Sequence, residues 1–164
     1  MESQQNLSQQ LGELLNHYKL ILTTAESCTG GGVSAAITDV AGSSAWFDRA
    51  FITYSNEAKM EMLGVSEATL ERFGAVSEQT VVEMVEGAIH NSNANVGVSI
   101  SGIAGPGGGT ELKPVGTVCF AWADSIGWKK VETLCLSGDR AQVRQQAVEH
   151  ALKVLYVELL AREI

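Results

Sequence analysis

The 164-residue sequence contains little cysteine, proline or aromatic side chain. Its three cysteines, Cys28, Cys119 and Cys135, are widely spaced, so they fit neither a disulfide framework nor a zinc-binding pattern. No basic segment precedes an apolar core at the N-terminus, and no apolar run approaches the length of a membrane span. These absences predict a protein of a reducing compartment, by default the cytoplasm, with no membrane partner.

Positive charge is also scarce, because 11 lysines and arginines stand against 19 acidic residues and give a net charge of −8. That balance disfavours nonspecific binding to nucleic acid or to anionic membranes. Much of the acidic excess lies between Glu57 and Glu86, where we interpret it as solvated helix faces rather than as a metal site. An anionic small-molecule substrate would need a local positive pocket.

Short apolar runs alternate with amphipathic segments along the whole chain. Strand character is found at residues 20–25, 46–54, 95–101, 115–123 and 129–136. Helices are predicted from a leucine stripe at residues 7–15 and after the N-cap candidates Ser55, Ser66, Ser77 and Asp139, the last with Gln142 in a capping box. This order predicts a single α/β domain over residues 1–164, a three-layer α/β/α sandwich with a mixed, mainly parallel sheet.

The stretch from Thr23 to Gly32 joins the first predicted strand to a helix and contains three consecutive glycines. In an open α/β sheet such a junction lies at the carboxyl edge, where ligands bind. Glycine backbone N–H groups can be approached closely by another molecule. We therefore expect Ser27 to be a nucleophile and the N–H groups that follow, including those of Gly30 and Gly31, to receive negative charge.

A serine nucleophile needs a base, and histidine is the usual one. The three histidines, His17, His90 and His150, fall within predicted helices, away from the loop edge. A Ser-His-Asp triad is therefore disfavoured, and a Ser–Lys pair is the remaining route, because a lysine with a lowered pKa can act as a base.

Lys59 is the best-placed lysine for that role. If Ser55 is the N-cap, Tyr54 and Lys59 occupy the two positions that touch in a hydrophobic staple, here as a phenol and an ammonium. The alternative is a solvated lysine paired with Glu57 or Glu61. Two rival nucleophiles also remain: Cys28, which has no evident histidine, and Thr29, whose hydroxyl could instead cap the helix or hold substrate.

Two further features are candidates for anion binding. The loop Ser101–Thr110 is rich in glycine, and its amides could form an anion-binding nest, the alternative being a flexible turn. Arg140 follows the cap Asp139 at a helix N-terminus, where the dipole is already positive. A phosphate held by both dipole and guanidinium would explain that arginine, and a salt bridge to Asp139 or a neighbour is the alternative.

Taken together, six segments resemble the CinA C-terminal domain family, which contains the nicotinamide mononucleotide deamidases. The segments run in the family's order over nearly the whole chain and lie at residues 24–31, 53–59, 74–77, 99–108, 113–118 and 137–140. The resemblance implies hydrolysis of nicotinamide mononucleotide to nicotinic acid mononucleotide and ammonia, by an α/β/α homodimer or higher homo-oligomer without a required metal or cofactor. The molybdopterin-binding-like domain of longer members is not found here, so we expect the stand-alone form.

The resemblance also implies roles for individual residues. Ser27, Lys59 and Tyr54 match the family's catalytic segments, with Lys59 as the base. The Ser101–Thr110 loop and Arg140 would orient the ribose phosphate, and the glycine-region amides would stabilise the oxyanion. Substrate binding is expected of Thr29, Gly30, Gly31, Ser101, Gly102, Ala104, Gly105, Thr110 and Arg140. A non-catalytic pyridine-nucleotide-binding module and a nucleoside-phosphate hydrolase are the alternative functions.

Overall fold

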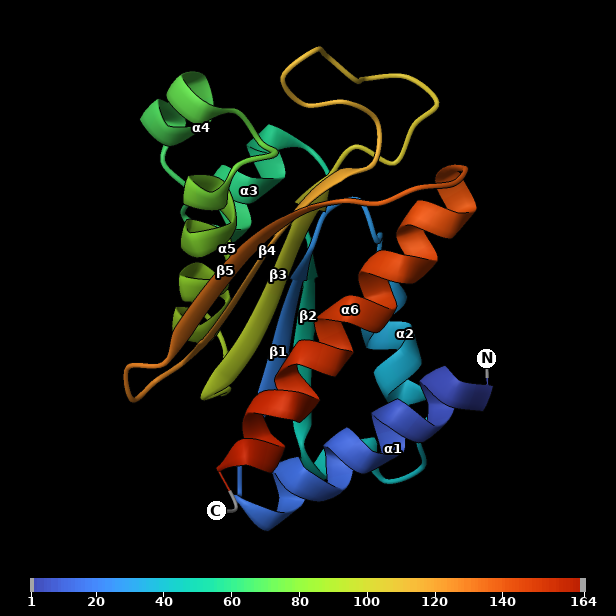
Figure 1. Ribbon diagram of the computed structural model, residues 1–164. Helices are drawn as coiled ribbons and strands as arrows, with labels where there is room; N and C mark the ends of the chain where they lie inside the picture. The colour runs from blue at the N-terminus through green and yellow to red at the C-terminus, as the bar shows by residue number, and fades with distance from the viewer. Residues whose placement is uncertain (1, 163–164) are drawn as a thin grey trace.

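A computed structural model describes residues 2–162 and places a five-stranded sheet between two layers of helices (Figure 1). The strands are β1 (Leu22–Glu26), β2 (Phe47–Ile52), β3 (Val96–Gly102), β4 (Thr117–Asp124) and β5 (Lys129–Cys135), in the order β2-β1-β3-β4-β5. β1 pairs in parallel with β2 and β3, whereas β4 is antiparallel to β3 and β5. Four of these strands therefore run in one direction, and the predicted mixed, mainly parallel sheet is confirmed.

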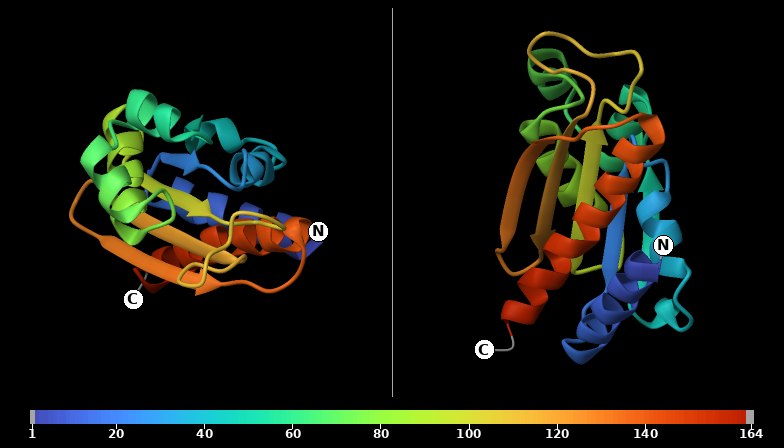
Figure 2. Two further views of the ribbon diagram at one scale, coloured as in Figure 1. Left: turned by 90° about the horizontal axis from the view of Figure 1, so that it is seen from above. Right: turned by 45° about the vertical axis from the view of Figure 1, so that its right-hand side comes forward.

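The helices divide between the two faces of the sheet, as the view from above shows (Figure 2). One layer holds α1 (Glu2–His17), α2 (Gly32–Thr38) and the long α6 (Arg140–Ala161). The other holds α5 (Glu78–His90), which packs on the sheet, with α3 (Asn56–Leu63) and α4 (Glu67–Phe73) against it. A short 3₁₀ turn, η1 (Ser43–Ala45), precedes β2. The three-layer α/β/α sandwich is confirmed.

Each layer has its own apolar core, which the helical periodicity anticipates. Leu11, Leu14 and Leu15 of α1 are buried against α6, whose stripe of Val143, Ala147, Ala151 and Leu155 is fully buried. Burial of this kind contributes roughly 25 cal/mol per Å² of apolar surface, so packing rather than helix propensity fixes these elements.

Three of the predicted N-caps form and one does not. Ser55 and Ser77 accept hydrogen bonds from Ala58 N–H and Thr80 N–H, and Asp139 forms the full capping box with Gln142. Ser66 precedes α4 but makes no side-chain cap bond. Its N–H instead donates to the Glu83 carboxylate of α5, at 2.8 Å, so a contact between helices replaces the local cap.

Two strands begin two residues later than predicted, for local reasons, and β2 ends two residues earlier, at Ile52. β1 begins at Leu22 rather than at residue 20, because Leu20 N–H still bonds the Leu15 carbonyl at the end of α1. β4 begins at Thr117 rather than at residue 115, because Thr117 N–H closes a turn onto the Pro114 carbonyl.

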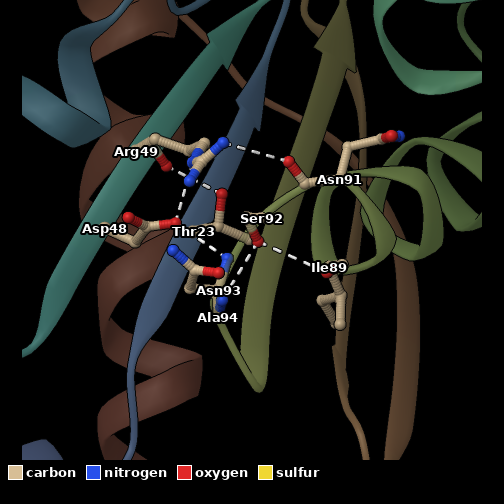
Figure 3. Close-up of polar contacts among 8 residues, drawn as sticks. All are labelled: Thr23, Asp48, Arg49, Ile89, Asn91, Ser92, Asn93 and Ala94. Carbon is tan, nitrogen blue, oxygen red and sulfur yellow. Dashed lines mark hydrogen bonds and ion pairs between the residues drawn. The ribbon is translucent and has the colours of Figure 1, made fainter.

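A polar network fastens the amino ends of the central strands (Figure 3). Arg49 donates to the Asp48 carboxylate at 2.8 Å and to the Asn91 carbonyl at 3.2 Å. Asn93 N–H also donates to Asp48, which lowers the pKa of that carboxyl, and Thr23 Oγ1 donates to the Arg49 carbonyl. The network ties β1, β2 and the α5–β3 turn together, and the carboxyl ends of β1 to β3 meet at the opposite edge.

Across residues 2–162, no helix combines the length and the apolarity that crossing a membrane requires.

Candidate functional site

A pocket of about 300 Å³ lies at the carboxyl edge of β1 and β3. Its lining comes from the β1–α2 junction, the start of α3, the segment after α4, the β3–β4 loop and the first residue of α6. The pocket brings together eight residues proposed from sequence: Ser27, Tyr54, Lys59, Ser101, Gly102, Ala104, Gly105 and Arg140. Four others, Thr29, Gly30, Gly31 and Thr110, do not line it.

Lys59 and Ser27 are in direct contact. The Lys59 ammonium donates to Ser27 Oγ at 3.0 Å and to the carbonyl oxygens of Thr53 and Tyr54 at 2.9 and 3.2 Å. The lysine side chain is only 1% exposed, and no ion pair with a carboxylate is found for it among the described residues. The alternative of a solvated lysine paired with a neighbouring glutamate therefore does not describe this side chain.

Burial lowers the pKa of Lys59 from 10.5 to about 8, because the charged form loses its hydration. At pH 7 about a tenth of such a lysine is the neutral amine, which can accept a proton. A neutral amine 3.0 Å from a hydroxyl is the arrangement that a general base requires.

Tyr54 contributes its backbone to this contact. Its carbonyl oxygen accepts from Lys59 and, at 3.4 Å, from Ser27 Oγ, whereas its side chain is 66% exposed. The staple geometry predicts a contact between the Tyr54 phenol and the Lys59 ammonium. In the structure Lys59 instead contacts the main-chain carbonyl of Tyr54. Tyr54 is among the residues that line the pocket.

Cys28 is a poor alternative nucleophile in this environment. The side chain is 6% exposed, and burial raises the pKa of its thiol to about 11. Because the thiolate is the reactive form, a thiol with this pKa is almost entirely unreactive at neutral pH.

The glycine amides after Ser27 are already used within the chain, one of them by the Glu26 carboxylate. Gly31 N–H donates to the buried Glu26 carboxylate at 3.2 Å, and Gly30 N–H bonds the Ser27 carbonyl at 3.1 Å. Thr29 is 1% exposed, and its hydroxyl donates to Glu26 at 2.7 Å. The expectation that these amides stand free for a ligand overlooks Glu26. An acidic residue just before a helix start was the available signal, because carboxylates favour helix N-termini.

Arg144 is a second residue that the sequence argument missed. From the second turn of α6 it donates to the carbonyl oxygens of Cys28 and Thr29, at 3.0 and 3.2 Å. Its position four residues after Arg140 places both guanidinium groups on one face of the helix, which was the available signal.

Arg140 points toward the loop after β3. Its guanidinium donates to the Gly105 carbonyl at 2.8 Å, and Asp139 bonds Gln142 instead of pairing with it. The salt bridge considered as the alternative is thus not found among the described residues. No aspartate or glutamate occurs among the described residues that line the pocket, which leaves Lys59 and Arg140 as its charges.

The loop itself offers backbone donors. Within residues 2–162, no hydrogen bond occupies the N–H groups of four pocket residues, Ala104, Gly105, Gly107 and Gly108. Gly105 has φ +86°, and an added Cβ would lie 2.5 Å from Val115 Cγ1, so the chain needs glycine there. Thr110 lies farther out, in a turn closed by two bonds to Lys113.

Among residues 2–162 no group of three or more histidines, cysteines, aspartates and glutamates is arranged to hold a metal ion.

Known proteins resemble this chain over nearly its full length. A model of the CinA C-terminal domain matches residues 4–159. The chain is 56% identical over 154 residues to a protein of Escherichia coli (strain K12) named nicotinamide-nucleotide amidohydrolase PncC, covering 94% of this chain and 93% of that protein. A Pseudomonas putida protein of the same name is 49% identical over 148 residues, covering 89% of this chain and 91% of its own. The crystal structure of the competence/damage inducible protein CihA from Agrobacterium tumefaciens has a TM-score of 0.92 at 43% identity, over 95% of this chain and 94% of that one.

Proposed function

The chain belongs to the CinA C-terminal domain family, and on that premise we propose that it is an amidase acting on nicotinamide mononucleotide. The products would be nicotinic acid mononucleotide and ammonia, with Ser27 as nucleophile and Lys59 as general base. Relatives that carry the name nicotinamide-nucleotide amidohydrolase, at 56% and 49% identity, support the substrate.

One observation carries the mechanism: the 3.0 Å contact between the Lys59 amine nitrogen and Ser27 Oγ, with the pKa of Lys59 lowered to about 8. Serine is unreactive without a base, and a desolvated lysine is one of the few side chains that can serve near neutral pH.

The reaction begins when neutral Lys59 accepts the Ser27 hydroxyl proton as Oγ bonds to the carboxamide carbon. The carbonyl oxygen becomes an oxyanion, and the C–N bond then breaks as the Lys59 ammonium returns the proton to nitrogen. Ammonia leaves an ester on Ser27. Water attacks that ester and gives one proton to Lys59, which passes it to Ser27 Oγ as the ester C–O bond breaks. The acid product releases the second proton of the water to solvent and departs as the carboxylate.

Stabilising the negative charge on the carbonyl oxygen requires backbone N–H donors that have no other hydrogen-bond acceptor. The unpaired N–H groups of the loop at residues 104–108 meet that requirement better than the amides committed to Glu26. Removing one oxyanion donor typically costs ~10²–10³ in rate. Tyr54, which lines the pocket and has an exposed side chain, is proposed to contact substrate and to assist protonation of the leaving group.

Arg140 is proposed to bind the substrate phosphate together with the N-terminus of α6 and the same loop. Arginine pairs well with phosphate because its donors form a planar fork. Ser101 and Gly102, at the end of β3, would contact the substrate between its phosphate and its reacting group.

The test is ammonia release from nicotinamide mononucleotide in the presence of EDTA, by wild type and Ser27→Ala. Ser8→Ala is the matched control, because that hydroxyl is buried in α1 without a hydrogen-bond partner. Release by wild type and Ser8→Ala that vanishes in Ser27→Ala supports the proposal.

Other outcomes favour other functions. Undiminished release by Ser27→Ala would move the nucleophile to Thr29 or Cys28. Binding of the nucleotide without ammonia release would favour a non-catalytic binding module, and release of phosphate would favour a nucleoside-phosphate hydrolase. A single domain over residues 1–164, a homodimer or higher homo-oligomer, a cytoplasmic location and independence from metals and cofactors stay predictions.

A further inference from the structure

Glu26 is a buried acidic side chain that the proposed reaction does not use. It is the last residue of β1, it directly precedes Ser27, and its exposed fraction is 0%. A buried carboxylate is costly unless hydrogen bonds replace its lost hydration. The hydrogen bonds of Glu26 indicate its role.

Five hydrogen bonds converge on its two oxygens. Four come from residues after Ser27 and one from the strand before it. Oε1 accepts from Thr29 Oγ1 (2.7 Å), Gly31 N–H (3.2 Å) and Val33 N–H (2.9 Å), and Oε2 from Ser34 N–H (3.0 Å) and Thr24 Oγ1 (3.1 Å). The carboxylate therefore closes residues 26–34 into a ring, and Ser27 is part of that ring.

These contacts exclude two simpler roles. A carboxylate has about four lone-pair positions, and five donors already share them, so Glu26 has no free site for a metal ion. None of its hydrogen bonds involves Ser27 Oγ or the Lys59 amine, so it is not the base either.

We propose that Glu26 is a positioning residue that holds Ser27 Oγ in line with Lys59. The Ser27 N–H is fixed to the Ile100 carbonyl of β3 at 3.0 Å, which anchors the backbone at the strand end. Arg144 holds the carbonyl oxygens of Cys28 and Thr29, and Glu26 holds the N–H and hydroxyl groups of the chain that follows. Without Glu26 those groups lose their acceptor, and the Ser27 turn depends on Arg144 alone on that side. A displacement of 1 Å at a reacting group can cost about 10²-fold in rate.

This inference rests on Ser27 being the nucleophile of the proposed function. Glu26→Gln is the informative variant, because its amide nitrogen replaces one acceptor oxygen with a donor. In either orientation that nitrogen faces at least one backbone N–H, that of Ser34 or those of Gly31 and Val33. A backbone N–H cannot reverse its role as a threonine hydroxyl can, so at least one of the five bonds is lost with little change in volume.

The experiment measures kcat and KM for nicotinamide mononucleotide, the Kd of nicotinic acid mononucleotide, and the labelling rate of Ser27 by an alkyl fluorophosphonate. Labelling forms the Oγ–phosphorus bond and breaks the phosphorus–fluorine bond, while fluoride leaves and the hydroxyl proton passes to Lys59. For Glu26→Gln we expect kcat and the labelling rate to fall together, by about 10- to 100-fold. KM and Kd should stay within about twofold, since the pocket-lining loop and Arg140 are not touched.

Ser99→Ala is the matched control. Its hydroxyl is equally buried on the neighbouring strand β3 but donates to the Val81 carbonyl of α5, at 2.6 Å. It should lose stability and keep kcat and the labelling rate.

Wild-type kcat and labelling rate in folded Glu26→Gln would overturn the proposal, as would a rise in KM at constant kcat. If Glu26→Gln does not fold, Thr29→Val removes only the 2.7 Å bond from Thr29 to Glu26. A fall in kcat of this variant supports the positioning role, and an unchanged kcat overturns it. If the wild type labels at Ser27 faster than the variant but releases no ammonia, the positioning role stands and the proposed function fails.

Discussion

The guanidinium of Arg140 donates a 2.8 Å hydrogen bond to the carbonyl oxygen of Gly105. This contact joins the first residue of α6 to the loop that follows β3, across 35 residues of sequence. It uses one donor of a group that has five, so the remaining donors stay available to an anion. The pocket thus combines a fixed cation with unpaired backbone amides.

Replacing Arg140 should weaken binding of a phosphate-bearing substrate. For Arg140→Gln we expect KM for nicotinamide mononucleotide to rise about 10- to 100-fold, because a hydrogen bond to a charged group is worth about 1.5–3 kcal/mol. Turnover of the phosphate-free riboside should change little. Steady-state kinetics with both substrates checks this, with Arg49→Gln, at the opposite edge of the sheet, as control. Equal losses on both substrates would contradict a phosphate contact.

The pH dependence of turnover should follow Lys59. Its pKa is lowered to about 8, and the neutral form is the base, so kcat/KM should rise with pH and level off above about pH 8. Lys59→Met should lower kcat by about 10²- to 10⁴-fold, and its kcat/KM should no longer rise with pH. A pH–rate profile from pH 6 to 10 provides the measurement, and a flat wild-type profile over that range would remove Lys59 from the base role.

Lys59 should also leave a signature in stability. Its folded pKa, about 8, lies below the ordinary value of 10.5, so between these values the unfolded chain binds more protons than the folded one. The free energy of unfolding should therefore rise with pH across that window, relative to Lys59→Met. Urea unfolding of both proteins at pH 7, 8.5 and 10 measures the difference. If the free energy of unfolding of wild type minus that of Lys59→Met stays constant or falls with rising pH, the lysine pKa is not lowered.

Asp124 should stabilise the end of the sheet at neutral pH. It accepts from Trp128 N–H, Ile126 N–H and Arg162, and these bonds outweigh burial and lower its pKa below 3.8. The contribution is complete above the unfolded pKa and is lost as pH falls through the folded value. Asp124→Asn should cost about 1–3 kcal/mol at pH 7.

Urea unfolding of wild type and Asp124→Asn at pH 7 and pH 3 gives the comparison. The difference in free energy of unfolding between the two proteins should be smaller at pH 3 than at pH 7. Asp48→Asn serves as a control, since that carboxyl also has a lowered pKa but lies in an exposed ion pair, where less than about 1 kcal/mol is expected. A gap for Asp124→Asn that is unchanged at pH 3 would rule out the linkage.

Local rules account for the parts of the molecule that the sequence predicted well. The Ser55 cap fixes the start of α3, and from that start follows the position of Lys59 on its first turns. Periodicity identified the buried faces of α1 and α6, because each face is specified by residues three and four apart.

Most of the parts that were missed depend on contacts between distant segments. That Arg144 reaches the Cys28 carbonyl 116 residues away becomes visible only when the layers are assembled. Glu26 was missed for a different reason: its partners lie within eight residues, and only its complete burial shows that the side chain folds back over them. The N–H of Ser66 likewise bonds Glu83 of another helix, a contact that no local pattern predicts. The sequence also does not encode which strands are neighbours in any local pattern.

The pocket draws its lining from residues as far apart as Ser27, which follows β1, and Arg140, which begins α6, and these elements meet only in the completed fold. No single hairpin or helix pair contains both the nucleophile and the proposed phosphate-binding group. Activity therefore requires the whole domain to be folded. Activity and global structure should be lost over the same denaturant range, and neither half of the chain alone should retain any turnover.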